Sequence, residues 1–243
     1  TGADITRYRT ERVSVLGALG EIEQVEAILG GTNARADRTR LASIFSANDR
    51  FDRAAETYLD VAGDDPNDSD ALAMAANNAL WGGRFETAAH IYEGLLEKKI
   101  ADPEIHTKFA QASLWADQAE RALPVLFKLV RDDEASEEQI LLYLEAVAAS
   151  DTLDPMHRQL VLQIHDERKA DLGNLAFVKT LADAMSRIGE DEAAIPILQV
   201  IVENEEANHA MRLRLAEALR VAGRFAEAEA HFQRLMAEAN PLQ

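Results

Sequence analysis

The 243-residue sequence contains no cysteine, only 6 prolines and 12 glycines, and no apolar run near the ~18 residues of a membrane-spanning helix. Without cysteine, disulfides and thiolate–metal sites are excluded, although this absence fits an oxidising compartment as well as a reducing one. We expect no segment to insert into a membrane, and no signal peptide is recognisable. The sequence starts at Thr1 and stops soon after a helical pattern, so we expect a piece of a longer protein.

Positive charge is scarce, because 25 Lys and Arg face 43 Asp and Glu, a formal net charge of −18. A chain this acidic repels phosphate backbones and anionic membrane surfaces, so nucleic acid is not an expected partner. Basic proteins and cationic polymers remain candidate partners, and solubility alone explains the charge equally well. The acid excess lies in residues 51–243, since residues 1–50 contain 7 basic and 7 acidic side chains.

The common catalytic and cofactor-binding motifs are also absent. The sequence has no His-Glu-x-x-His zinc motif, no phosphate-binding loop, no Gly-x-Gly-x-x-Gly fingerprint and no Gly-x-Ser-x-Gly elbow. Its 6 histidines are scattered; the nearest candidate pair, His157 and His165, fits a solvated helix face better than a metal site. We therefore predict no enzymatic activity, no catalytic residues, no cofactor and no metal site.

What the sequence does contain is a repeat whose period equals the spacing from Trp81 to Trp115. Segment 79–85 reads ALWGGRF and segment 113–119 reads SLWADQA, which aligns the two tryptophans. Alanines recur at positions 54, 88, 122, 194 and 228, and the wide gap between 122 and 194 leaves room for one longer, irregular repeat. Turn residues keep the same register, at Asp49, Gly83, Asp117, Gly189 and Gly223. A fixed period of this length predicts stacked helical hairpins.

These patterns resemble the tetratricopeptide repeat (TPR), which pairs a large with a small residue in its first helix and places Ala-x-x-x-aromatic in its second. The first pattern is found at Leu41-Ala42, Ala75-Ala76, Phe109-Ala110, Leu181-Ala182 and Leu215-Ala216. The second begins at each of the recurring alanines, with Tyr, Leu or Phe four residues on. Two bulky residues, Tyr143-Leu144, replace the first pattern in the irregular repeat. The resemblance implies an all-α, right-handed superhelix of about seven hairpins.

We expect these hairpins at about 4–29, 33–61, 70–97, 103–130, 137–169, 174–203 and 207–239. The predicted organisation is an irregular N-terminal hairpin at 1–32, three regular repeats at 33–134, the irregular repeat at 135–173 and two regular repeats at 174–243. All of them are expected to form a single solenoid domain.

The first helix of each TPR lines the inner, concave wall, and the resemblance carries the wall positions over to this sequence. Counted within each repeat, the second position gives Asp70, Glu104 and Glu138. The ninth position gives Asn77, Gln111, Glu145, Asp183 and Glu217, and the thirteenth gives Trp81 and Trp115. They predict a groove with a run of carboxylates, central amides and two indoles near one edge. Such a groove suits a basic protein segment, an extended cationic chain or a sugar-like chain. A merely solvated helix face, with the tryptophans packed at helix ends, explains the same residues.

The segment Ala-Leu-Trp-x-Gly-Arg-Phe at 79–85 is similar to TPR regions of bacterial exopolysaccharide secretion proteins of the Pel, cellulose, poly-N-acetylglucosamine and alginate types. Those regions lie in the periplasm and recruit polysaccharide-modifying enzymes during biofilm formation. The resemblance implies a non-catalytic scaffold whose protein partner is a polysaccharide deacetylase or hydrolase.

Two alternatives stay open. The acidic groove could bind and guide a cationic polysaccharide directly, or the chain could be a cytoplasmic assembly or chaperone-type adaptor. The carboxylate clamp of such adaptors needs Lys and Arg on the inner wall, where the sequence offers chiefly Lys179, Arg187 and Arg220 among acids.

Overall fold

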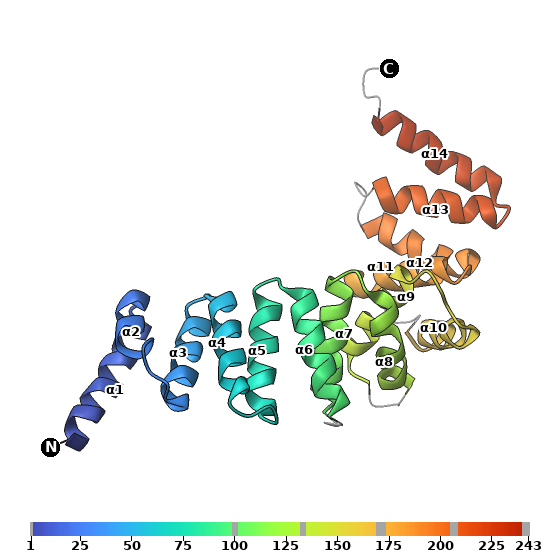
Figure 1. Ribbon diagram of the computed structural model, residues 1–243. Coiled ribbons are helices and arrows are strands. Elements are labelled where there is room, and N and C mark those ends of the chain that lie inside the picture. Colours follow the sequence, from blue (N-terminus) through green and yellow to red (C-terminus); the bar gives the residue numbers. More distant parts are fainter. Residues whose placement is uncertain (1, 99–101, 132–134, 169–173, 205–208, 240–243) are drawn as a thin grey trace. The chain divides into compact units, whose positions relative to one another are not determined.

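The computed structural model describes residues 2–98, 102–131, 135–168, 174–204 and 209–239. Over these ranges the chain folds into fourteen helices and contains no strand (Figure 1). It divides into two compact units, Thr1–Ala116 and Asp117–Gln243. Among the described helices, none combines the length and the apolar character needed to cross a membrane.

The first unit is a row of helices, each packed against the next in sequence. They are α1 (Gly2–Ala18), α2 (Ile22–Leu29), α3 (Arg35–Ala47), α4 (Phe51–Gly63), α5 (Ser69–Trp81), α6 (Phe85–Glu97) and α7 (Pro103–Trp115). The second unit comprises α8 (Ala119–Arg131), α9 (Glu137–Ala149), α10 (Pro155–Arg168), α11 (Leu175–Arg187), α12 (Asp191–Asn204), α13 (His209–Val221) and α14 (Phe225–Ala239). The all-helical prediction is confirmed, and each expected hairpin coincides with one pair of consecutive helices. Two of the expected hairpin ends, 169 and 207, lie outside the described residues.

A single backbone device closes the regular hairpins. The turn residue adopts the left-handed conformation, with φ of 57° at Asp49, 75° at Gly83, 56° at Asp117, 77° at Gly189 and 75° at Gly223. After Asp49, Gly83, Gly189 and Gly223, the next N–H returns to a carbonyl five residues earlier, as from Arg84 N to Ala79 O at 2.8 Å. This closure satisfies a carbonyl that the helix end leaves free. The N-terminal hairpin uses the same turn at Gly20, whose φ is 73°.

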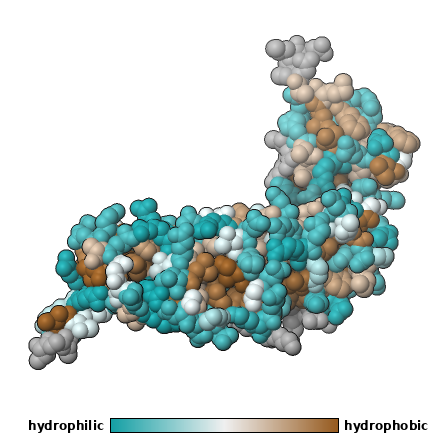
Figure 2. Space-filling view, viewed as in Figure 1, coloured by the Kyte–Doolittle hydropathy of each residue, from teal (hydrophilic) through white to brown (hydrophobic). Residues whose placement is uncertain are grey.

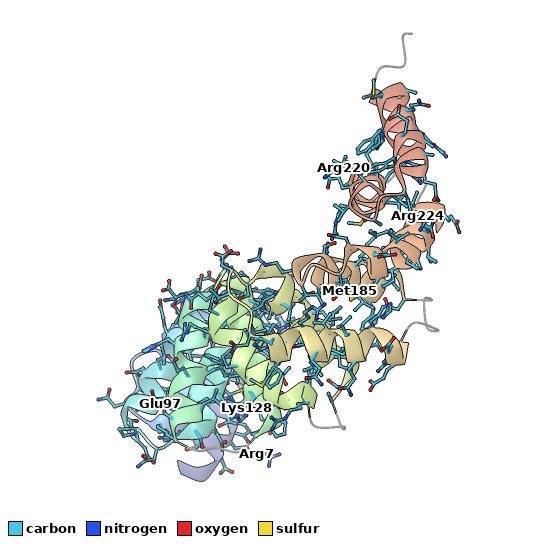
Figure 3. The ribbon with its side chains drawn as sticks, turned by 90° about the vertical axis from the view of Figure 1, so that its right-hand side faces the viewer. Arg7, Glu97, Lys128, Met185, Arg220 and Arg224 are labelled. Atoms are coloured by element: carbon cyan, nitrogen blue, oxygen red, sulfur yellow. The ribbon has the colours of Figure 1, made fainter. Side chains whose placement is uncertain are left out.

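Small side chains allow the helices to approach closely. All but one of the alanines of the two repeat patterns are completely buried, and Ala228 is 3% exposed; the completely buried ones are Ala42, Ala54, Ala75, Ala76, Ala88, Ala110, Ala122, Ala182, Ala194 and Ala216. Larger side chains such as Tyr92 and Met185 fill the space between them (Met185 is labelled in Figure 3). The core therefore runs as a strip along the stacked helices of each unit, because each hairpin buries its apolar side against its neighbours.

The hairpin of α9 and α10 departs from the others. Helix α9 packs directly against α8 and α11, whereas the main helix neighbour of α10 is α11 (Figure 1). A longer connection, residues 150–154, replaces the tight turn and lets α10 lie beside the row of stacked helices. Tyr143 and Leu144 are both fully buried here. In the other hairpins a small residue stands in this pair and lets a neighbouring helix approach, whereas here the two bulky side chains fill that space themselves.

Candidate functional site

A surface pocket of about 260 Å³ opens in the first unit among α5, α6 and α7. Its walls are formed by Ser69, Asp70, Ala73, Asn77, Tyr92, Asp102, Glu104, Ile105 and Lys108. We call this site the α5–α7 pocket. It brings together three of the residues that the sequence predicted, Asp70, Asn77 and Glu104, from two neighbouring hairpins.

The base of the pocket is a fixed hydrogen bond. The hydroxyl of Tyr92 donates to Asn77 Oδ1 at 2.7 Å, and only 1% of Tyr92 is exposed. Burial, and secondly the charge of Glu104, raise the pKa of Tyr92. The phenol is therefore a neutral donor at physiological pH, and it holds the Asn77 carbonyl so that the amide nitrogen is left for other partners.

Carboxylates surround this base. Asp70 and Glu104 lie in the first turns of α5 and α7, where the helix dipole favours negative charge. Asp102 caps α7 by accepting from the backbone N–H of Glu104 at 2.9 Å. Within the described residues, neither Asp70 nor Glu104 forms an ion pair. Lys108 is the single cation in the lining, and its Nζ donates to Gln111 Oε1 at 3.4 Å. Three carboxylates and one ammonium leave the pocket net negative.

The two tryptophans lie at the other end of the same helices, in equivalent environments. Trp81 packs against Phe51 with ring centroids 5.9 Å apart, and Trp115 packs against Phe85 at 5.2 Å. About half of each tryptophan remains exposed, 57% of Trp81 and 48% of Trp115. Because a helix rises about 1.5 Å per residue, Trp81 lies roughly 16 Å along α5 from Asp70. The indoles thus flank the wall at the turn edge and do not line the α5–α7 pocket.

The remaining predicted residues belong to the second unit and differ in environment. Asp183 forms an ion pair with Arg214, which also donates to Ala182 O at 3.3 Å. Burial lowers the pKa of Arg214, opposed by the charge of Glu217. Burial raises the pKa of Glu145, which is half-buried on α9, whereas Glu138 and Glu217 are exposed. The acidic wall positions of this unit are therefore not equivalent, since one is neutralised by a cation.

Sequence reasoning missed six of the lining residues, and Tyr92 and Lys108 are the two whose polar groups matter most to the pocket. Tyr92 was assigned to the core by its repeat position, yet its hydroxyl reaches the pocket while the ring packs inside. Lys108 stands four residues after Glu104, and that spacing places two side chains on one helix face. The spacing from Glu104 was therefore the signal in the sequence that could have identified Lys108. Of the cations that the sequence assigned to the wall, Arg187 instead donates to Ser150 O at 2.6 Å and to Asp151.

A second cavity, of about 250 Å³, lies beneath residues 150–154 in the second unit and is lined by Glu120, Leu123, Pro124, Ser150, Thr152, Leu153, Asp154 and His157. His157 is buried, with Nδ1 3.1 Å from the Tyr143 hydroxyl and the Phe127 ring 5.0 Å away. Burial lowers the pKa of His157, opposed by the charge of Asp154. Among the described residues, no three His, Cys, Asp or Glu side chains are grouped to hold a metal ion. We assign His157 a packing role at the start of α10.

Comparisons with known proteins agree with this architecture. Residues 153–239 match the model of the bacterial transcriptional activator domain, BTAD. No curated protein sequence matches the chain. A tetratricopeptide repeat protein from Parabacteroides merdae is 15% identical, with a TM-score of 0.55, 95% of this chain covered and 92% of that one.

Two further solved structures are similar. YrrB, described as a TPR protein with an unusual peptide-binding site, is 17% identical with a TM-score of 0.59, covering 82% of this chain and 96% of that one. A chain of the Naa15/Naa10 complex bound to HypK-THB is 14% identical with a TM-score of 0.59, covering 97% of this chain but 37% of that one. Together with the all-helical hairpins and their repeated turns, these similarities show that the chain has a TPR-like fold.

Proposed function

We propose that the chain is a non-catalytic scaffold that binds a basic segment of a protein partner in the α5–α7 pocket. The observation that carries the proposal is the arrangement of Asp70 and Glu104, which carry no ion pair among the described residues, around the fixed Tyr92–Asn77 bond. Carboxylates held in this way are acceptors for Lys or Arg, and charge-assisted hydrogen bonds are roughly twice as strong as neutral ones. The description of YrrB as a peptide-binding TPR protein supports the same use of the fold.

We infer that this scaffold works in a bacterial exopolysaccharide export complex in the periplasm, where its partner is a polysaccharide deacetylase or hydrolase. The support is the likeness of segment 79–85 to TPR regions of such systems. A bacterial domain model matching residues 153–239 is consistent with a bacterial protein. That model concerns transcriptional activators, but the net charge of −18 on the whole chain disfavours its direct contact with DNA.

A second candidate function is direct binding of a cationic polysaccharide. The half-exposed indoles of Trp81 and Trp115 favour it, because aromatic faces combine apolar area with attraction for cations. In that case the polymer contacts both the acidic pocket and the turn edge, whereas a short basic peptide needs the pocket alone.

The test is a charge-reversed variant, Asp70→Lys with Glu104→Lys, assayed by fluorescence anisotropy with labelled Lys/Arg-rich peptides and partly deacetylated poly-N-acetylglucosamine oligomers. We expect loss of peptide binding with helical content unchanged, and weaker binding by the parent chain as salt rises. The matched control is Glu86→Lys with Glu97→Lys, which changes the charge equally on exposed positions of α6 (Glu97 is labelled in Figure 3). Equal peptide binding by both variants would contradict the proposal that the peptide binds in the α5–α7 pocket.

Extending the reversal to Glu138→Lys tests whether the second unit contributes to the same partner. Loss of oligosaccharide binding on Trp81→Ala and Trp115→Ala, with peptide binding retained, supports the polymer as the ligand of the turn edge.

A further inference from the structure

Another surface pocket of the first unit lies between α1 and α3, and its charge is opposite to that of the α5–α7 pocket. Its volume is about 480 Å³, and it is lined by Ser14, Gly17, Ala18, Arg40, Ser43, Ile44, Ala47 and Asn48. We call it the α1–α3 pocket. Among these described lining residues, Arg40 is the single charged side chain, in a chain whose net charge is −18.

Small residues create the space in the α1–α3 pocket. Gly17 is buried, and a Cβ added to it would lie 3.1 Å from Ile44 Cγ2, so α1 and α3 approach closely at this point. Ala47 stands at the repeat position that Trp81 and Trp115 occupy in the next two repeats. Because alanine replaces the indole here, the wall beside Arg40 is left open.

The Arg40 side chain is half-buried and held in place by α1. Its Nη2 group donates to Thr10 O at 2.8 Å and to Ser14 Oγ. Within the described residues, the N–H groups on Nε and Nη1 form no hydrogen bond, and the side chain forms no ion pair. The nearby Arg9 and Arg38, by contrast, both pair with carboxylates. Arg40 is therefore a positioned cation that still has donors to offer.

These groups suit an anionic partner. The Ser14 hydroxyl accepts from Arg40, so its own proton is available to a further acceptor. Hydrogen bonds from a guanidinium to a carboxylate are charge-assisted and stronger than neutral ones. A carboxylate in the α1–α3 pocket would therefore gain donors from two side chains without meeting a carboxylate of the lining.

The α1–α3 and α5–α7 pockets lie on the wall formed by the first helices of one unit. Ser43 and Asn77 hold the same repeat position and line one pocket each, as do Arg40 and Lys108 two repeats apart. Helices α1 to α5 form a row in which each packs on the next (Figure 1). At 8–10 Å for each packed pair, the two pockets are at most about 40 Å apart. An extended segment of about twelve residues spans that distance.

We propose that the α1–α3 pocket binds a carboxylate of the same partner segment whose basic residues enter the α5–α7 pocket. This inference rests on the proposed function. The carboxylate belongs either to an Asp or Glu side chain or to a chain terminus. The partner segment is then recognised by a pattern of charge, an acid and a base at a set separation. Arg40 also repels a basic residue placed at its pocket, which fixes the register of the segment along the wall.

The surface seen in Figure 2 is largely hydrophilic, with apolar areas of limited size. On that side, the protein offers a partner polar contacts instead of one broad apolar patch. Recognition by paired charges agrees with such a surface.

The experiment measures fluorescence anisotropy of labelled, C-terminally amidated peptides with the 243-residue chain. One peptide carries the Lys/Arg segment alone. Others extend it by Gly/Ser linkers of about 6, 9 and 12 residues that end in Glu, and each has a twin ending in Gln. A further set ends in Gln with a free C-terminal carboxylate, which distinguishes a chain terminus from a side chain as the source of the carboxylate.

Two variants close the α1–α3 pocket in different ways. Arg40→Met removes the cation, and Ala47→Trp narrows the pocket without changing the charge. Both introduce the residue that the next repeat has at the same position, Met74 or Trp81, so the fold should survive, which far-UV circular dichroism checks. Arg12→Met is the matched control, because Arg12 is exposed on α1 and points roughly away from Ser14 at 3.6 residues per turn.

We expect the best Glu peptide to bind the parent chain about tenfold more tightly than its Gln twin. This gain should disappear in Arg40→Met and Ala47→Trp and persist in Arg12→Met, while the affinity for the Lys/Arg segment alone stays unchanged in all three. A gain seen with the free terminus and not with Glu supports the pocket and identifies the terminus as its ligand. No gain from either carboxylate at any linker length overturns the proposal, as does a gain that both pocket variants retain.

A parent chain that does not bind the Lys/Arg segment refutes the proposed function of the α5–α7 pocket. The α1–α3 pocket is then decided by a Glu-containing peptide without basic residues. Binding of this peptide that is lost in Arg40→Met and kept in Arg12→Met supports the carboxylate site, and absence of binding overturns it.

Discussion

Two glycines of one hairpin should respond in opposite ways to the same substitution. Gly94 lies inside α6 and Gly83 lies in the turn before it, and an added Cβ meets no atom within 4 Å at either position. Space is therefore equal at the two sites. The backbone conformation differs between them, because Gly83 has a φ of 75° whereas Gly94 is helical.

At Gly94, alanine restricts the unfolded chain and suits the helix interior, so Gly94→Ala should stabilise the first unit by about 0.5–1 kcal/mol. At Gly83 the same entropic gain, about 0.4–1 kcal/mol, is outweighed by the cost of about 1–2 kcal/mol for an L-residue in the left-handed region. Gly83→Ala should therefore destabilise by about 1 kcal/mol. Gly83→Asp should lose less, because Asp49 and Asp117 already adopt this conformation at equivalent turns.

The assay is urea unfolding followed by far-UV circular dichroism, with midpoints compared because stacked repeats need not unfold in one step. The midpoint should rise for Gly94→Ala and fall for Gly83→Ala. Shifts of equal sign would mean that backbone conformation does not decide the effect. A loss of stability in Gly94→Ala would show that this face of α6 is covered.

Three further outcomes follow from buried groups. Ala88→Leu and Ala76→Leu should each cost roughly 1–3 kcal/mol, because both sites are completely buried; unfolding midpoints equal to the parent's would show that the assigned register is wrong. Tyr92→Phe should cost about 0.5–1.5 kcal/mol by removing the 2.7 Å bond to Asn77, and it should weaken peptide binding in the anisotropy assay; unchanged affinity would dismiss this bond as an organiser of the pocket. Burial lowers the folded-state pKa of His157, so the unfolded chain binds more protons and stability should fall as pH drops below about 6.5; a His157→Phe variant with an equally steep pH dependence of its urea midpoint would contradict this.

The helices and turns could be predicted because they depend on local, periodic chemistry. Alanine at a fixed position lets helices approach, and Gly or Asp at the turn tolerates positive φ. Both kinds of residue recur with the same period, so the sequence alone indicates the helices and the turns between them. Of the predicted site residues, Asp70, Asn77 and Glu104 come together because α5 and α7 both pack against α6. The partner-binding role of these residues stays a prediction.

Other features depend on tertiary contacts, which cannot be inferred from the identity of single residues in the sequence. The hydroxyl of Tyr92 leaves the core to reach the pocket, and Arg214 pairs with a carboxylate one repeat earlier. The sequence marked residues 135–173 as irregular, but it gave no sign that α9 packs directly against α11. Tyr143 and Leu144 are both fully buried on α9, and helical propensity alone does not reveal which helices such residues will pack against.

The position of α10 has a consequence for hydrogen exchange. Since α9 and α11 pack on one another directly, the stack remains continuous whether or not α10 is docked. Helix α10 is held by side-chain contacts such as His157 with Tyr143 and Arg158 with Glu190. It can therefore open as a local unit while its neighbours stay protected. Amides of α10 should exchange through this partial opening, at rates insensitive to substitutions that stabilise α9 and α11.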